Sequence, residues 1–408
     1  MLTLEQTSQF SDILEEFGKA LDITEAQHDA VVKSYRFVGE WLADEASQLA
    51  RYKPDILPQG SFLFGTMTKP ESEADDLDID LVCRLEGKQP DWTQFNLKAI
   101  VGNRLKSNGI LEKLVVIPDG RRCWTLKHAE SAQFHMDILP AIVSSGYKII
   151  LEKSLTTTAS SDFSQLAIRI TDKNRTDYRT STSPEAWLVS NPFGYGIWFE
   201  QRATIAFQKS MKMSEAVHPV PAYHRDKLPL QRVVQILKRH RDMMFNGDCD
   251  KPVSMIITTL AAKAYEKETN IAEALGNVIR RMPSQIEDRY SPEHRRVIKW
   301  VANPVHPDEN FADKWVENPQ KENNFYRWMQ QVSIDVTNAL QQTGLNKIRE
   351  SLEKPFGEKT IIKAFGNYGE KLRSLRESGA MKMAEKTGIL GMVGRAPVPQ
   401  HSNFGSDE

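Results

Sequence analysis

Residues 60–81 read GSFLFGTMTKPESEADDLDIDL, a Gly-Ser turn followed by a polar loop and then by alternating acidic and apolar residues. Side chains of a β-strand point alternately to opposite faces, so the apolar residues of LDIDL would face a core. Asp78 and Asp80 would then project together from the other face. Two neighbouring carboxylates repel each other unless a cation lies between them. The pattern therefore predicts a site for divalent metal ions.

A pair of such ions suits phosphoryl or nucleotidyl transfer, in which it clamps the attacking and leaving oxygens. The Gly-Ser turn would hold phosphates through its backbone N–H groups. The bland alternative is a solvated loop, because ESEADDLDID is also a simple acidic run. In the same alternation Asp76 would lie on the face of Asp78 and Asp80, so Asp76 and Asp78 are an alternative pair of metal ligands. The pair Asp78 and Asp80 is preferred because Leu81 and Val82 keep Asp80 inside the strand.

A second strand is predicted where residues 133–143 read QFHMDILPAIV. Its alternation places His135, Asp137 and Leu139 on one face. A single aspartate on a strand is more often an edge or capping residue. Two bridged metal ions, however, need ligands from more than one strand, and Asp137 is therefore predicted as the third carboxylate.

Two polar residues of the downstream helices are candidates for contact with a triphosphate. Lys238 lies one helical turn after Val234, at the border of an apolar stripe, where an ammonium group can be held near a buried face. The alternative is that the basic run 238–241 is a solvated charged face, with His240 a packing or surface residue. Ser254 begins the next apolar helix, where helix capping is the default role and phosphate contact the other.

Composition and charge restrict the class of protein. The 408-residue chain has a formal net charge of -1, which offers no overall electrostatic reason to bind DNA, RNA or an anionic membrane. Cys83, Cys123 and Cys249 lack the paired spacing of a zinc site or a disulfide framework. The start of the chain has neither a basic segment nor a long apolar run. A cytoplasmic protein with no membrane partner is expected.

Periodicity predicts an α/β (α+β) fold, in which a mixed α/β region precedes a helical one. A capping box of Thr24 and Gln27 separates two helices within residues 3–50. Further predictions are a helix at 91–107, a hairpin formed by 114–117 and 122–126, a loop at 152–182, and helices from 183 to 378 with an interruption at 191–195. The predicted domains are residues 1–182, residues 183–387 and a mobile tail at 388–408.

Six motifs in order carry a resemblance to a known family. They are GSFLFGT, DLDIDLVCRL, FHMDILPAI, NPFGYGIWF, PLQRVVQILKRHRD and PVSMIITTLAAKAY, spread over about residues 55–270. This set resembles the bacterial cGAS/DncV-like nucleotidyltransferases, or CD-NTases, within the DNA polymerase beta-like nucleotidyltransferase superfamily. The resemblance implies a polymerase beta-like core with a mixed sheet, packed on a C-terminal helical domain that completes the nucleotide cleft.

By this resemblance the chain would make a cyclic di- or trinucleotide second messenger from NTPs, with ATP first among them. Two Mg2+ or Mn2+ ions would serve as cofactors. The product would activate a downstream effector protein in anti-phage (CBASS) signalling, with CBASS accessory proteins as further partners. Activation by DNA is not expected, since three scattered cysteines cannot supply the zinc insertion of the animal DNA-sensing relatives.

The resemblance also implies roles for individual residues and favours Asp78 and Asp80 as the pair. The residues are Asp78, Asp80 and Asp137 as catalytic metal ligands, Gly60 and Ser61 at the donor phosphates, and Lys238 and Ser254 at the triphosphate. Two other functions remain as alternatives. One is a nucleotidyltransferase that makes a linear polymer or modifies RNA or protein, and the other is a catalytically silent nucleotide-binding module.

Overall fold

The computed structural model describes residues 3–70, 76–128, 133–144, 147, 150, 163–204, 223 and 226–399, and it divides into two compact units. The sheet unit comprises Ile23–His224 and Pro304–Asp308. The helical unit comprises Met1–Asp22, Arg225–Asn303 and Glu309–Glu408. The first helix thus belongs with the C-terminal helices, and residues 183–224 belong with the sheet. Both differ from the predicted border at 182/183.

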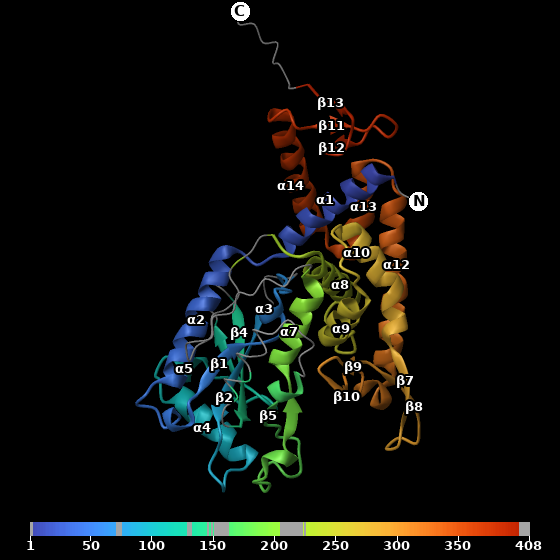
Figure 1. Ribbon diagram of the computed structural model, residues 1–408. Coiled ribbons are helices and arrows are strands. Elements are labelled where there is room, and N and C mark those ends of the chain that lie inside the picture. Colours follow the sequence, from blue (N-terminus) through green and yellow to red (C-terminus); the bar gives the residue numbers. More distant parts are fainter. Residues whose placement is uncertain are drawn as a thin grey trace, which may run out of the picture. The chain divides into compact units, whose positions relative to one another are not determined.

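The described part of the sheet unit is built on a six-stranded mixed sheet (Figure 1). Its path is β1-β2-β4-β5-β6, with β3 also paired to β4. Strands β2 and β4 are parallel, and the other pairs are antiparallel. The strands are β1 (Asp55–Pro58), β2 (Leu77–Glu86), β3 (Trp124–His128), β4 (Phe134–Val143), β5 (Ile168–Ile170) and β6 (Leu188–Ser190). The predicted mixed α/β fold is confirmed.

The two faces of this sheet follow the alternation seen in the sequence. Leu77, Ile79 and Leu81 are buried in one core, to which helices α2 (Glu25–Ala43) and α4 (Gln94–Lys106) contribute. Each fully buried side chain of this size stabilises the fold by about 1.5–3 kcal/mol. The opposite face has a second core that includes residues of α7 (Pro192–Ala203). Asp78 and Asp80 lie on this opposite face, beyond the edge of the second core.

The helical unit consists largely of helices. They are α1 (Leu4–Leu21), α8 (Pro229–Phe245), α9 (Ser254–Ala264), α10 (Ile271–Arg281), α11 (Lys314–Glu317), α12 (Pro319–Gln341), α13 (Leu345–Phe356) and α14 (Glu358–Glu377). Helix α1 packs against α10 and α14, and the rings of Phe17 and Phe356 lie 5.5 Å apart. Capping boxes start α1 at Thr3 and α2 at Thr24, the second as predicted. Among the described helices, none has the length and hydropathy needed to cross a bilayer.

Two predicted elements of the sheet unit differ from those observed. The Gly-Ser turn is the start of a short helix, α3 (Gly60–Phe64). The predicted hairpin forms only in part, because Leu114 ends helix α5 (Leu111–Leu114) and β3 pairs along its whole length with β4. A single bridge, Val115 to Leu126, joins the two segments of the predicted hairpin. A five-residue ladder with β4 satisfies more backbone groups than that bridge.

Predicted helices also give way to strands in two places. After the 3-10 turn Pro184–Ala186 the chain forms β6, and the predicted interruption at 191–195 is the start of α7. The side chain of Asn191 caps α7 by accepting the N–H of Gly194 at 3.0 Å. In the helical unit, β7 (Glu287–Ser291) and β8 (Arg296–Trp300) form an antiparallel hairpin, followed by β9 (Ala302–Asn303). Strand β10 (His306–Asn310) begins within Pro304–Asp308, which belongs to the sheet unit. Of the loop predicted at 152–182, residues 152–162 lie outside the described residues.

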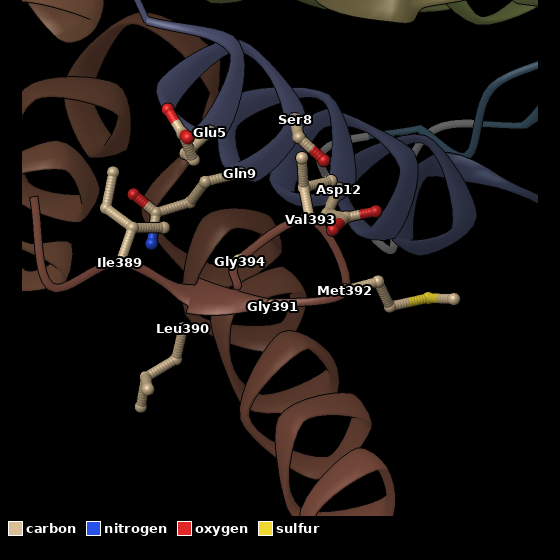
Figure 2. A pocket seen from close by; sticks show the side chains of 10 residues that line it. All are labelled: Glu5, Ser8, Gln9, Asp12, Ile389, Leu390, Gly391, Met392, Val393 and Gly394. Carbon is tan, nitrogen blue, oxygen red and sulfur yellow. The ribbon is translucent and has the colours of Figure 1, made fainter. Parts of the chain in front are cut away.

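The predicted mobile tail is ordered over its first part. Strands β12 (Leu390–Gly391) and β13 (Ala396–Pro397) each pair antiparallel with β11 (Lys382–Met383). The segment Ile389–Gly394 lies along α1, and a small pocket separates it from Glu5, Ser8, Gln9 and Asp12 (Figure 2). Residues 400–408 lie outside the described part of the chain.

Candidate active site

The parallel pairing of β2 and β4 brings the three predicted carboxylates together. In this register Asp80 is the partner of Asp137, and Asp78 is the partner of His135. One carboxylate oxygen from each of Asp78, Asp80 and Asp137 lies within 4.8 Å of the other two. We call these three residues the acidic triad. Asp78 is exposed, while Asp80 and Asp137 are half-buried, so the triad is open to solvent on one side.

Asp137 is held by a neighbouring strand. Thr125 of β3 is its partner in the antiparallel register, and the Thr125 hydroxyl donates to Asp137 Oδ1 at 2.5 Å. Burial raises the pKa of Asp137, although the hydrogen bond from Thr125 acts in the opposite direction. The charge of Asp78 raises the pKa further. A carboxylate of this kind is a stronger proton acceptor than an exposed aspartate.

Asp78 has a histidine as its neighbour. His135 Nε2 lies 3.2 Å from Asp78 Oδ1, and His135 Nδ1 lies 4.0 Å from Asp76 Oδ2. Asp76 in turn pairs with Lys127 Nζ at 3.2 Å. The hydrogen bond to Asp78 raises the pKa of His135, which burial alone would lower. Asp76 thus lies at the edge of the site, paired with a lysine, and is not a member of the triad.

The start of α3 lies directly beside Asp80. The backbone N–H of Gln59 donates to the Asp80 carbonyl oxygen at 2.9 Å. Gly60 has a φ of 61°, and a Cβ built there would lie 2.6 Å from Asp80 Oδ2. Both the backbone conformation and this close approach require glycine. Gly60, with Ser61 next to it, is therefore close to the acidic triad.

Lys238 and Ser254 belong to the helical unit, whereas the acidic triad belongs to the sheet unit. Lys238 is buried in α8, as are all residues of the basic run 238–241, so the solvated-face interpretation is wrong. Ser254 is the first residue of α9, after the cap Val253, and its hydroxyl accepts a hydrogen bond from Arg241 at 2.7 Å. His240 is a packing residue, as interpreted, and is 1% exposed.

The donor set of the triad fits a divalent cation of the Mg2+ type. Carboxylate oxygens are the ligands that such an ion prefers, and three of them converge from two strands. Asp248, Cys249 and Asp250 also bring ligand atoms close together, on a loop of the helical unit. There, however, Lys321 already forms an ion pair with Asp250 at 2.8 Å. The triad is therefore the stronger candidate for a metal centre.

Sequence reasoning assigned no role to Thr125, His135 or Lys127. The alternation of side chains along β4 places His135 on the same face as Asp137, so the sequence alone could have identified His135 as a neighbour of the site. Thr125 could not be identified in the same way, because its position depends on the register between β3 and β4. A register between strands depends on tertiary packing, which local alternation does not encode.

Comparisons with known proteins agree on a family. Residues 54–140 match the model of the nucleotidyltransferase domain of cyclic GMP-AMP synthase DncV-like proteins. A c-di-GMP synthase of Roseivirga ehrenbergii is 27% identical over 398 residues, covering 97% of this chain and 96% of that protein. The cyclic dinucleotide synthase CdnG of Bradyrhizobium diazoefficiens is 22% identical over 425 residues, covering 96% of this chain and 94% of that protein.

Solved structures show the same fold. The B. diazoefficiens CD-NTase CdnG in complex with GTP has a TM-score of 0.63 at 18% identity, covering 88% of this chain and 99% of that chain. The E. coli CdnC:HORMA-deltaN complex matches with a TM-score of 0.52 at 13% identity, covering 83% of this chain and 93% of that chain. The fold and the sequence matches define a nucleotidyltransferase. More narrowly, residues 54–140 match the DncV-like nucleotidyltransferase domain, and the two relatives are cyclic dinucleotide synthases, in agreement with the resemblance that the motifs predicted.

Proposed function

We propose that this enzyme makes a cyclic dinucleotide second messenger from NTPs. The acidic triad supports this proposal most directly, because three converging carboxylates are what two-metal nucleotidyl transfer requires. The two relatives named above are both cyclic dinucleotide synthases and match almost the whole chain. A cyclic trinucleotide is the other ring size that the motif resemblance allows.

Asp78, Asp80 and Asp137 would hold two Mg2+ or Mn2+ ions. When bound, these ions would neutralise the charge of the attacking and departing oxygens. Asp137 is proposed to complete the metal site and to assist deprotonation of the acceptor ribose hydroxyl, as the motif resemblance implies. The hydroxyl oxygen then attacks the α-phosphorus of the donor nucleotide, the bond to the β-phosphate breaks, and pyrophosphate leaves. The same exchange, repeated within the linear intermediate, closes the ring.

Backbone groups at the start of α3 are proposed to hold the donor phosphates. Gly60 and Ser61 lie next to Asp80, so phosphates bound there would be close to the metal ligands. Lys238 and Ser254 are proposed to bind the triphosphate on the strength of the motif resemblance. Lys238→Ala should then raise the apparent KM for NTP more than kcat falls, because it removes a binding cation. An unchanged KM would contradict this role.

GTP is the nucleotide to test first. The R. ehrenbergii relative is named for a product made of two GMP units, and the CdnG structure contains GTP. ATP, the nucleotide expected from the motif resemblance, is the next candidate. We further propose that the product activates an effector in anti-phage (CBASS) signalling. The complex of E. coli CdnC with a HORMA protein supports a search for an accessory partner.

Product identification tests the proposal. The purified protein is incubated with each NTP alone and with all four, in Mg2+ or Mn2+, then treated with phosphatase and analysed by mass spectrometry. A phosphatase-resistant product of two linked GMP units is expected. A phosphatase-sensitive ladder would instead identify a linear polymerase. No release of pyrophosphate from any NTP mixture would identify a catalytically silent binding module.

A further inference from the structure

We propose that His135 is a positioning residue that orients the Asp78 carboxylate for metal binding. This inference rests on the proposed function, since it assumes that Asp78 is a metal ligand. It begins with the backbone, because Asp78 and His135 are register partners on the parallel strands β2 and β4. Their side chains therefore project from neighbouring positions on the same face of the sheet.

The two side chains approach within the distance of a hydrogen bond or ion pair. His135 Nε2 lies 3.2 Å from Asp78 Oδ1, so an N–H at Nε2 donates to that oxygen and leaves the second carboxylate oxygen for another ligand. The Asp78 side chain is 62% exposed and begins its strand, where packing does little to select a rotamer. Among the residues that the structure describes, His135 is a neighbour that can select one.

The histidine ring is supported on its other side. Nδ1 faces Asp76 Oδ2 at 4.0 Å, and Lys127 Nζ holds the same Asp76 oxygen at 3.2 Å. The Asp76 side chain is only 17% exposed, which makes it the most buried member of this chain of contacts. Lys127, Asp76 and His135 thus form a connected row that ends at Asp78. Outer residues of this kind commonly fix the orientation of the groups that bind a metal.

Asp137 has a comparable support on β3. The hydroxyl of Thr125 donates to one of its carboxylate oxygens, and the ring of His135 lies 3.2 Å from a carboxylate oxygen of Asp78. Two of the three triad carboxylates are therefore oriented by a side chain that is their register partner on the adjacent strand. The same strand pairing that assembles the triad also supplies its supports.

Direct metal binding tests the inference without any turnover. Mn2+ binding to the full-length protein is measured by electron paramagnetic resonance for the wild type, His135→Ala and His135→Gln. His135→Ala should weaken Mn2+ binding by about 10-fold, the lower end of the usual effect of removing such a support. Glutamine places an amide N–H near the position of Nε2, so His135→Gln should restore binding to within about 3-fold of the wild type.

A histidine of the same sheet serves as the control. His128 contacts Ser34 and stacks on Phe134 with ring centroids 4.3 Å apart, so His128→Gln should leave Mn2+ binding unchanged. Thermal unfolding shows whether each variant is folded. Unchanged or tighter binding in His135→Ala would overturn the inference, as would a folded His135→Gln that binds as weakly as the alanine variant. Wild-type protein that binds no Mn2+ would overturn it as well.

The two proposals can fail separately. If the wild type binds Mn2+ and His135→Ala weakens that binding, the positioning role stands even when no cyclic product is found. If cyclic product forms and the Mn2+ affinities are equal, the proposed function stands and the positioning role is wrong. Asp76→Asn should give a smaller loss of Mn2+ affinity than His135→Ala, because it acts only through the histidine ring.

Discussion

The acidic triad of the sheet unit and helix α8 of the helical unit arrange charge in opposite ways. The acidic triad gathers three like charges on one partly exposed face, with a hydrogen bond from Thr125 to Asp137 and a close contact of His135 with Asp78. Helix α8 buries cations completely but pairs them, since Arg232 donates to Asp22 at 2.8 Å and to Glu15 at 3.2 Å. Adjacent like charges destabilise a fold, whereas hydrogen-bonded opposite charges can be buried. The adjacent like charges of the triad suit a catalytic site, whereas the paired charges of α8 suit a structural role.

Arg232 is a buried charge against which neighbouring helices of the helical unit pack closely. Its side chain is fully buried, and a Cβ on Gly18 of α1 would collide with it. Gln235 and Lys227 also bond to Asp22, at 2.9 and 2.7 Å. Helices α1 and α8 are therefore joined by a network in which buried hydrogen-bond donors and acceptors pair with one another.

The largest expected effect is on the acidic triad. Asp78→Asn combined with Asp80→Asn should reduce product formation by at least ~10,000-fold, about 5 kcal/mol of activation free energy, because the metal ligands are lost. The same variant should keep or increase its thermal stability, since repulsion between the carboxylates is relieved. Pyrophosphate release and circular dichroism melting measure the two quantities. NTP consumption at the wild-type rate would show that the site is wrongly assigned.

The next effect is on stability and concerns the helical unit. Arg232→Met should lower the free energy of unfolding by about 3–5 kcal/mol, because Asp22 is left buried with fewer partners. Arg373→Met is the matched control, since Arg373 is exposed and pairs only with residues of its own helix in the described structure. That change should cost less than about 0.5 kcal/mol. Urea unfolding measures both, and equal losses would refute the structural contrast.

A smaller effect on activity is expected at the support of Asp137. Thr125→Val removes the hydroxyl that donates to Asp137 and keeps the shape of the side chain. Turnover should fall about 10-fold, as is usual for loss of a support to a metal ligand. Thr171→Val is the control, because the Thr171 hydroxyl bonds to the Arg122 carbonyl oxygen and does not contact the triad. Steady-state pyrophosphate release compares the two, and equal rates would contradict the role of Thr125.

The smallest effect is a pH dependence of stability. Burial lowers the pKa of His240, and the hydrogen bond to Asp335 at 3.0 Å only partly opposes this. The unfolded chain therefore takes up a proton near its ordinary pKa of about 6.5, whereas the folded protein does not. This contribution to stability is present above that pH and is lost as the pH falls, by at most about 1.4 kcal/mol per unit.

The pH prediction is checked by the difference between two proteins. Urea unfolding of the wild type and of His240→Gln at pH 7.5 and pH 5.5 isolates the contribution of this histidine from those of the other eight. The variant should lose less stability on acidification than the wild type. An equal loss in both proteins would show that His240 takes up its proton without unfolding.

Local patterns in the sequence determined much of this protein. Alternation in LDIDL and FHMDIL established which face of each strand carries Asp78, Asp80 and Asp137, and capping residues established where α2 begins. Such patterns are readable because side-chain direction repeats every two residues in a strand and every 3.6 in a helix. The ordered motifs supplied the family.

Only the tertiary structure decided which of these elements meet. It paired β3 along its whole length with β4 and only at a single bridge with Val115, and the pairing with β4 placed Thr125 against Asp137. It also buried the basic run of α8, where Asp335 and Ser254 accept hydrogen bonds from His240 and Arg241. Those partners lie 95 and 13 residues away along the chain, and residues that far apart leave no local periodicity by which they could be matched.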